Sequence, residues 1–198
     1  MQNQYTLMRH GESLANRKGL IVSAPENALH DYGLTSKGAD QVINVALKSR
    51  IHSDTLIVSS DYRRAFETAE IVHSVVACKQ DIVTDERIRE RFFGDWELND
   101  HRHYDDVWQN DLNSPNASNH NVESVMDTLA RAQNLIDSLE AEHSNRSILL
   151  VSHGDVLQIL LAHYHRLNPR FHRSLSAIGN AEVRSLAKLE LANKSTAA

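Results

Sequence analysis

The apolar run Ile148–Val151 constrains the fold more than any other segment, because no polar residue interrupts it. A strand buried on both faces has this pattern, and such strands occur mainly in parallel sheets that helices cover on both sides. Further candidate strands cover Tyr5–Met8, Thr55–Ser59 and 81–84, with a last one at 181–191. Helical stretches separate them. The chain is therefore predicted to form an α/β three-layer sandwich with a mostly parallel central sheet and helices on both faces.

Four helices are expected from the spacing of the apolar residues. The first begins after a capping threonine, Thr35, and the others cover about 61–77, 122–143 and 154–165. Residues 10–34 are punctuated by glycine and proline and are expected to form a loop. The apolar faces are expected at Val42, Val45, Ala46 and Leu47 in the first helix, at Ala65, Phe66, Ala69, Val72 and Val76 in the second, and at Val125, Leu129, Ala132, Ile136 and Leu139 in the third.

Residues 86–122 are expected to be irregular or weakly helical, because they are rich in His, Asn and Asp. The stretch is too long for an ordinary connection between a strand and a helix. We predict a single domain over residues 1–198, in which residues 86–122 form a small cap over one edge of the sheet.

Composition and charge exclude several classes of function. The chain has 198 residues, a formal net charge of −5 and one cysteine, Cys78. An acidic chain offers no general basic face for nucleic acid, and one cysteine cannot form a disulfide within the chain. No apolar run reaches the ~18 residues of a membrane span, and the N-terminus does not resemble a signal peptide. We predict a cytoplasmic protein without nucleic-acid or membrane partners, of undetermined oligomeric state.

Charged and imidazole side chains follow three of the predicted strands. Arg9 and His10 follow the first strand, Arg64 lies shortly after the second, and His153 follows the fourth. Ligands of open α/β sheets bind at the carboxyl ends of the strands, so these side chains are expected to meet in one crevice. Such a pocket suits a compact anion, and phosphate fits best, because the planar guanidinium of arginine presents paired donors to its oxygens.

Five motifs, in order along the chain, resemble those of the histidine phosphatase superfamily, in its phosphoglycerate mutase-like branch. The first is Arg9-His10-Gly11 within 7–13, together with Asn16, and the others lie at 34–38, 59–69, 89–97 and 151–154. The resemblance spans roughly residues 5–190. It implies the same α/β fold and a phosphoryl-transfer activity.

The resemblance also implies a role for each matching residue. His10 is the expected nucleophile, which becomes phosphohistidine, and Glu90 is the expected proton donor to the leaving oxygen. A neutral imidazole is a competent nucleophile near pH 7. Fixed cations stabilise the charge that develops on the transferring phosphoryl group, so neither a metal ion nor a cofactor is required. The expected phosphoryl ligands are Arg9, Asn16, Arg64, His153 and Gly154.

Simpler interpretations remain open for several of these residues. Glu90 could instead pair with a neighbouring arginine, at 87, 89 or 91. Only one of Arg63 and Arg64 can face the pocket easily, because adjacent helical residues point about 100° apart, and the motif selects Arg64. Glu12 is expected to order the loop after the first strand. The histidine pairs 101/103 and 163/165 suit a solvated surface better than a metal site, because residues two apart do not share a helix face.

Residues in and beside the expected cap leave the substrate open. Trp96 and Trp108 could line the pocket, although packing in the core is at least as plausible for Trp96. Leu98 and Asn121 depart from the family pattern and bracket the cap.

The favoured function is a metal-independent phosphomonoester hydrolase acting on a small phosphorylated metabolite. The alternatives are a cofactor-dependent mutase of the phosphoglycerate type and a non-catalytic phosphate-binding or interaction module. The short 86–122 segment favours hydrolysis, because the mutases of the family are longer and have a larger cap that excludes water. The presence of the whole expected catalytic set argues against the non-catalytic module.

Overall fold

The central sheet sets the positions of all the residues singled out above. A computed structural model describes residues 1–187, and within them the sheet has five strands in the order β3-β2-β4-β1-β5. The first four along the chain are mutually parallel, and β5 runs antiparallel to β1. The prediction of a mostly parallel sheet is therefore confirmed. The strands are β1 (Gln4–Arg9), β2 (Leu56–Ser59), β3 (Val83–Thr84), β4 (Ser147–Ser152) and β5 (Val183–Ser185).

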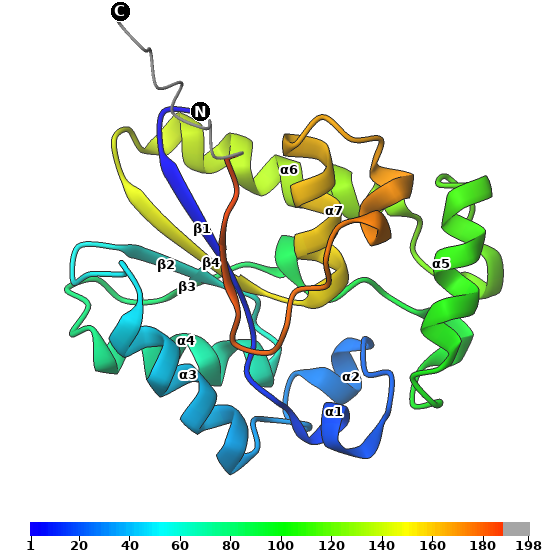
Figure 1. Cartoon of the computed structure of the whole chain (residues 1–198), viewed down its shortest axis with the longest axis horizontal. Helices are drawn as coiled ribbons and strands as arrows, with labels where there is room; N and C mark the ends of the chain where they lie inside the picture. The colour runs from blue at the N-terminus through cyan, green and yellow to red at the C-terminus, as the bar shows by residue number, and fades with distance from the viewer. Residues whose placement is uncertain (188–198) are drawn as a thin grey trace, which may run out of the picture.

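Helices cover both faces of this sheet. In Figure 1, α3 and α4 lie against one face, and α6 and α7 lie against the other. The α-helices are α1 (Leu14–Lys18), α2 (Pro25–Ala28), α3 (Ser36–Lys48), α4 (Arg63–Val75), α5 (His103–Asn113), α6 (Val125–Glu142) and α7 (Gly154–Tyr164). Four 3₁₀ segments complete the described part: Glu86–Ile88, Gly94–Trp96, Asn119–Asn121 and Pro169–Ser174.

The central strands have apolar side chains on both faces, as the unbroken apolar run of β4 predicts. Ile148 and Leu150 point into the core shared with α6 and α7, whereas Leu149 and Val151 point into the core shared with α3 and α4. All four are at most 1% exposed. Two cores on opposite faces of one sheet make the three-layer sandwich.

Most of the apolar positions predicted for the long helices are buried, but Phe66 is only half-buried and belongs to neither core. The hydroxyl oxygen of Thr35 accepts a hydrogen bond from the Gly38 amide at 3.0 Å and so caps α3. The five apolar positions predicted for 122–143 are all buried in α6. Leu47 is 68% exposed, so its assignment to the apolar face of α3 is wrong. It directly follows Ala46, and successive helical residues point about 100° apart, which carries Leu47 away from the sheet.

Two stretches are more helical than the sequence indicates. Residues 10–34 were expected to be a loop, but they contain α1 and α2. A capping box between Ser13 and Asn16 begins α1, and Gly19, with a φ of 68°, ends it. Helices of one turn have too few residues to show periodicity, so caps and tertiary packing define them. Residues 86–122 contain α5, whose eleven residues bury only Val107 and Asp111.

The end of the chain is described only in part. The predicted strand 181–191 corresponds to the three residues of β5, and positions 188–191 lie outside the described residues. The predicted strand at 81–84 is reduced to the two residues of β3. Between residues 1 and 187, none of the helices combines the length and apolar character that crossing a bilayer requires.

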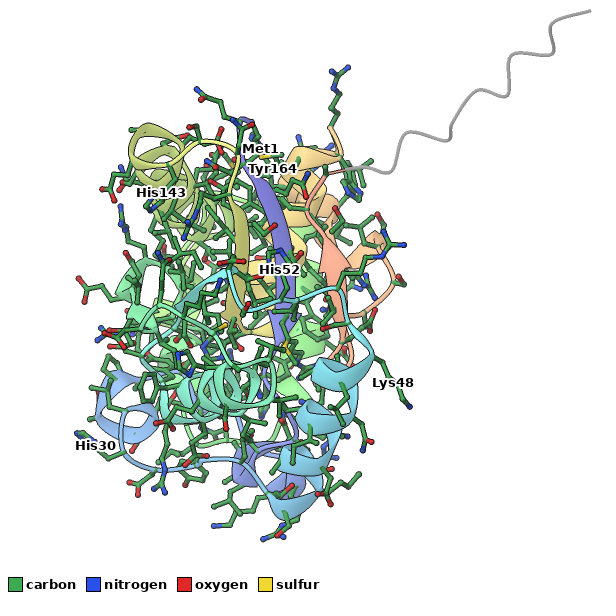
Figure 2. All side chains as sticks on the ribbon, turned by 90° about the vertical axis from the view of Figure 1, so that its left-hand side faces the viewer. Met1, His30, Lys48, His52, His143 and Tyr164 are labelled. Atoms are coloured by element: carbon green, nitrogen blue, oxygen red, sulfur yellow. The ribbon has the colours of Figure 1, made fainter. Side chains whose placement is uncertain are left out.

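The carboxyl ends of β1, β2 and β4 point toward α1 and α2 (Figure 1). Figure 2 labels Met1, just before β1, and His30, just after α2, at opposite ends of the molecule. The residues that follow the parallel strands therefore lie at the carboxyl edge of the sheet, on the side of α1 and α2, as predicted.

Candidate active site

The residues predicted from the strand ends come together at the carboxyl edge of the sheet. Pairing of β1 with β4 places His10 beside His153, and their ring centroids are 5.3 Å apart. The His10 amide donates a hydrogen bond to the Ser152 carbonyl at 3.0 Å. A cavity of about 150 Å³ opens at this point. The predicted residues that line it are Arg9, His10, Asn16, Arg64, Glu90 and Gly154.

His153 is fully buried and, unlike the other predicted residues, is not among those that line the cavity. Its Nδ1 atom lies 4.0 Å from Glu90 Oε2, and its Nε2 atom lies 2.9 Å from the hydroxyl oxygen of Ser60. Burial, Arg64 and His10 together hold the pKa of His153 well below its usual range. The imidazole is therefore neutral near pH 7.

His10 is held as a neutral imidazole with a defined tautomer. Its Nδ1 atom lies 2.7 Å from the Gly11 carbonyl oxygen, which can only accept, so Nδ1 carries the proton. The lone pair of the imidazole is then on Nε2, where it accepts a hydrogen bond from Nε of Arg64 at 3.1 Å. Burial, followed by the charges of Arg64 and Arg9, holds the pKa of His10 well below its usual range. An uncharged, oriented imidazole nitrogen is the form that a nucleophile requires.

Three buried nitrogens at this site have no hydrogen-bond partner within residues 1–187. They are Nε of Arg9, Nη1 of Arg64 and Nδ1 of His153. Other donors of the two arginines are used, because Arg9 Nη1 donates to the Ile178 carbonyl at 2.8 Å and Arg64 Nη2 donates to the Val22 carbonyl at 3.0 Å. Buried donors left unpaired are costly and call for a ligand. Two fixed cations with spare donors suit an oxyanion such as phosphate.

Glu90 is a buried carboxyl without an arginine partner at its side chain. Burial raises its pKa to about 7, with the charge of Asp155 adding to the increase and Arg64 opposing it. Its Oε1 atom accepts a hydrogen bond from the Arg91 backbone amide at 3.0 Å. The simpler interpretation, pairing with a neighbouring arginine, is contradicted, because each arginine has another partner: Arg87 pairs with Asp85, Arg89 with Asp61, and Arg91 with Asp111 and Asp155.

Asn16 and Gly154 also lie where the sequence predicts. Oδ1 of Asn16 accepts hydrogen bonds from the Ser13 amide and from Asn180, each at 3.1 Å, and these fix the side chain at the cavity wall. Gly154 begins α7, and a Cβ atom there would lie 3.5 Å from the Arg9 guanidinium. The helix end adds partial positive charge at the same place.

Arg63 and Glu12 lie outside the cavity and have structural partners. Arg63 pairs with Glu67 at 2.7 Å, and Arg64, not Arg63, lines the cavity, as predicted. The Glu12 carboxylate accepts hydrogen bonds from Thr35 and Lys37, which ties the loop after β1 to the start of α3, also as predicted.

The segment 86–122 contributes aromatic walls to the cavity. Tyr104 and Trp108 stack with their rings nearly parallel, and Phe93 packs edge-on against Tyr104. Trp108 lines the cavity and donates to Asp155 Oδ1 at 2.9 Å. Trp96 lines a different hollow, where it stacks on His103.

Sequence reasoning missed several residues of the site. Tyr104 precedes Trp108 by one helical turn, and this spacing could have revealed it. Gln158 and Arg173 also line the cavity, and the Arg173 guanidinium lies 3.6 Å from the Trp108 ring centroid. No motif surrounds Arg173, so no local signal pointed to it.

Comparison with known proteins gives the family. A family model of the histidine phosphatase superfamily (branch 1) matches residues 5–194. The chain belongs to the histidine phosphatase superfamily. This confirms the family that the five motifs predicted.

Curated members of the superfamily include both mutases and phosphatases. The chain is 32% identical to the probable phosphoglycerate mutase GpmB of Proteus mirabilis over 80% of its length and 73% of the relative's. It is 30% identical to the adenosylcobalamin/alpha-ribazole phosphatase of Escherichia coli, over 79% and 76% of the two chains. Both relatives are similar enough to support membership of the family. Their names give different reactions, a mutase for one and a phosphatase for the other.

Solved structures of superfamily members have the same fold. The mycobacterial glucosyl-3-phosphoglycerate phosphatase complexed with VO3 superimposes with a TM-score of 0.78 and 26% identity, over 92% of this chain and 91% of that one. A putative alpha-ribazole-5'-P phosphatase from Escherichia coli gives a TM-score of 0.76 at 26% identity, over 93% and 90%. Phosphatases therefore recur among the similar structures.

Proposed function

We propose that this chain is a metal-independent phosphomonoester hydrolase that forms phosphohistidine on His10 and acts on a small phosphorylated metabolite. The state of His10 carries the proposal. Its lone pair is oriented at Nε2, and the unpartnered donors of two arginines lie beside it. A neutral nucleophile next to fixed positive charge is the arrangement that phosphoryl transfer needs.

The proposed reaction has two steps. In the first, the Nε–H of Arg64 leaves Nε2 of His10 for a phosphoryl oxygen, and the freed lone pair of Nε2 forms a bond to phosphorus. The ester P–O bond breaks, and the protonated carboxyl of Glu90 gives its proton to the leaving oxygen. In the second, Glu90 takes a proton from water as the water oxygen attacks phosphorus, and the P–N bond breaks to release phosphate. Throughout both steps, Arg9, Arg64 and His153 bind the phosphoryl oxygens, with further contacts from Asn16 and Gly154.

The cavity supports a small substrate. An engineered protein cavity of about 150 Å³ holds benzene, so a cavity of this size accommodates a phosphoryl group with a compact leaving group. The aromatic rings of Tyr104 and Trp108 form one wall. Their apolar faces suit the carbon skeleton of a metabolite.

Trapping of the intermediate tests the proposal. After a rapid quench with a phosphate ester, the wild-type protein is expected to carry an acid-labile, base-stable phosphate on His10, detected by mass spectrometry. His10→Ala is expected to stay folded and to lose all turnover, because the covalent route is gone. Unchanged hydrolysis of p-nitrophenyl phosphate by a folded His10→Ala variant would contradict the assignment.

Metal independence has its own test. The guanidiniums of Arg9 and Arg64 can neutralise a phosphate dianion, so EDTA is expected to leave kcat/KM unchanged, while vanadate and inorganic phosphate inhibit competitively. Loss of activity in EDTA that a divalent ion restores would overturn this part.

A mutase is the second candidate, favoured by the similarity to the probable phosphoglycerate mutase. Incubation with 3-phosphoglycerate separates the two reactions, because a mutase forms 2-phosphoglycerate whereas a phosphatase releases free phosphate. A protein that binds phosphate and never acquires it on His10 would be the non-catalytic module.

A further inference from the structure

Ser60 is a buried residue that the proposed mechanism does not yet use. It directly follows β2, is 0% exposed, and its hydroxyl oxygen lies 2.9 Å from Nε2 of His153. The backbone amide of Tyr62 donates to the same hydroxyl oxygen at 3.2 Å. Ser60 therefore connects the end of β2 to the histidine that follows β4.

The hydrogen bonds of the Ser60 hydroxyl define which partner donates. A serine hydroxyl has one proton to give and two lone pairs that accept. The Tyr62 amide occupies one lone pair, and among residues 1–187 the one acceptor within hydrogen-bond distance of the hydroxyl is Nε2 of His153. If Nε2 carried the proton and donated to the second lone pair, the buried hydroxyl proton would have no acceptor among these residues, which is costly. We therefore place the hydroxyl proton on the side of Nε2 and the lone pair of the imidazole on Nε2.

The other nitrogen of His153 gives a second, independent argument. Nδ1 has no hydrogen-bond partner in the described chain, and its nearest charged oxygen is Oε2 of Glu90, 4.0 Å away. An Nδ1–H at this place can donate to an anionic oxygen. A lone pair at Nδ1 would instead face the ligand's negative charge and weaken its binding.

We propose that Ser60 is a positioning residue that holds His153 in the tautomer with its proton on Nδ1, ready to donate to a phosphoryl oxygen. The proposal deepens the proposed function and rests on it for the role of His153 toward the phosphoryl group. The residue that follows β2 thus prepares the imidazole that follows β4, in the same way that the Gly11 carbonyl prepares His10.

The tautomer can be observed directly by ¹⁵N-histidine NMR of the full-length protein without substrate. The His153 signals are those that disappear in His153→Asn. In the wild type, Nδ1 is expected at the chemical shift of a protonated nitrogen and Nε2 at that of an unprotonated one. A wild-type His153 that carries its proton on Nε2 would overturn the proposal, even if the Ser60 variants failed to fold.

Kinetics measure the consequence. Ser60→Ala is expected to lower kcat/KM by about 10- to 100-fold, the range typical for removing an outer partner that orients a histidine, and to give His153 mixed-tautomer signals. Ser60→Thr keeps the hydroxyl and should restore both the tautomer and most of the activity. A folded Ser60→Ala variant with wild-type kinetics and an unchanged tautomer would refute the proposal.

Ser59→Ala is the matched control. Ser59 is also 0% exposed, but its hydroxyl donates to the Ser60 carbonyl at 2.8 Å and does not reach His153. Ser59→Ala therefore removes one buried hydroxyl, as Ser60→Ala does. In Ser59→Ala, however, the tautomer of His153 and kcat/KM should stay near the wild-type values. An equal loss in both alanine variants would assign the effect to general packing and reject a specific role for Ser60.

The NMR experiment also separates this inference from the proposed function. A protein without phosphatase activity whose His153 carries its proton on Nδ1 would refute the proposed function and leave the tautomer assignment standing. An active phosphatase whose His153 carries its proton on Nε2 would refute the tautomer assignment and leave the proposed function standing.

Discussion

Arg64 and Arg91 are both buried arginines, 3% and 1% exposed, yet their surroundings are opposite. Arg91 makes two 2.7 Å hydrogen bonds to Asp111, one of 3.2 Å to Asp155 and one of 2.7 Å to the Glu123 carbonyl. Arg64 has no carboxylate partner within hydrogen-bond distance in the described chain, and its Nη1 atom is unpartnered. Complete pairing marks an arginine that holds the fold together, whereas incomplete pairing marks one that awaits a ligand.

The pKa values follow the same division. Burial lowers the pKa of Arg64, while the hydrogen bonds that Arg91 donates to Asp111 and Asp155 and the charges of these carboxylates raise the pKa of Arg91 despite its burial. The two buried acids behave in parallel. Burial raises the pKa of Glu90 to about 7, but His172 and Arg91 outweigh burial at Asp155 and hold its pKa below the usual range.

Replacing the unpaired arginine should have the largest effect on activity. Arg64→Met removes one of the two cations at the phosphoryl site, and kcat/KM is expected to fall by about 10³-fold or more. The free energy of unfolding should change by no more than about 1 kcal/mol, because relief from burying an unpaired charge offsets the lost hydrogen bonds. Urea unfolding and phosphatase assays check both values. A stability loss as large as that of Arg91→Met would break the comparison.

Replacing the unpaired acid should have the next largest effect. Glu90→Gln is expected to lower kcat/KM about 10²- to 10⁴-fold for an alkyl phosphate, whose basic leaving group needs a proton. A p-nitrophenyl ester should lose clearly less. An equal loss on both esters would remove Glu90 from the catalytic set.

The pH dependence of Glu90 sharpens the same test. The acid must be protonated to act, so wild-type kcat/KM on the alkyl ester should fall as the pH rises through about 7. Folded Glu90 holds its proton between its ordinary pKa of 4.5 and about 7, whereas the unfolded chain releases it. Its contribution to stability is therefore present below pH 4.5 and is lost as the pH rises to about 7. Glu90→Gln lacks this titration, so the free energy of unfolding of the wild type minus that of the variant should fall as the pH rises from 4.5 to about 7.

Replacing the paired arginine should affect activity least and stability most. Arg91→Met leaves Asp111 and Asp155 buried without their cation, and the free energy of unfolding should fall by about 3–5 kcal/mol. Activity per folded molecule should change only a few-fold, because Arg91 does not line the cavity. The double variant Arg91→Met/Asp111→Leu should recover part of the stability. A 10³-fold loss of kcat/KM with unchanged stability would reverse the roles of the two arginines.

Much of the candidate site could be predicted from the sequence, because short motifs at strand ends carry Arg9, His10, Arg64 and His153. Unbroken apolar runs likewise predict the parallel strands, because burial on both faces leaves no alternative pattern. The pairing of Arg91 with Asp111 could not be predicted. It joins two points of the 86–122 segment whose polar composition conceals α5, and only the folded chain brings them together.

The same limit applies to Arg173 and Ser60. Arg173 reaches the cavity from a 3₁₀ segment that has no periodicity, and the role of Ser60 depends on the orientation of a hydroxyl proton. One-turn helices such as α1 depend on caps and packing, which a search for periodicity overlooks. Sequence reasoning thus found the side chains expected to bind the phosphoryl group, and missed both the further cavity residue Arg173 and the buried Ser60 beside His153.

The position of β4 between β2 and β1 affects how the protein forms as it is synthesised. Within residues 1–187, β1 pairs only with β4 and β5, and its first partner begins at residue 147. A nascent chain therefore carries the strand that precedes His10 unpaired until most of the sequence has left the ribosome. Closing so long a loop is slow because its entropy must be lost before the contacts form. The sheet and the imidazole pair of His10 and His153 are consequently completed in one late event, and a shorter nascent chain has neither.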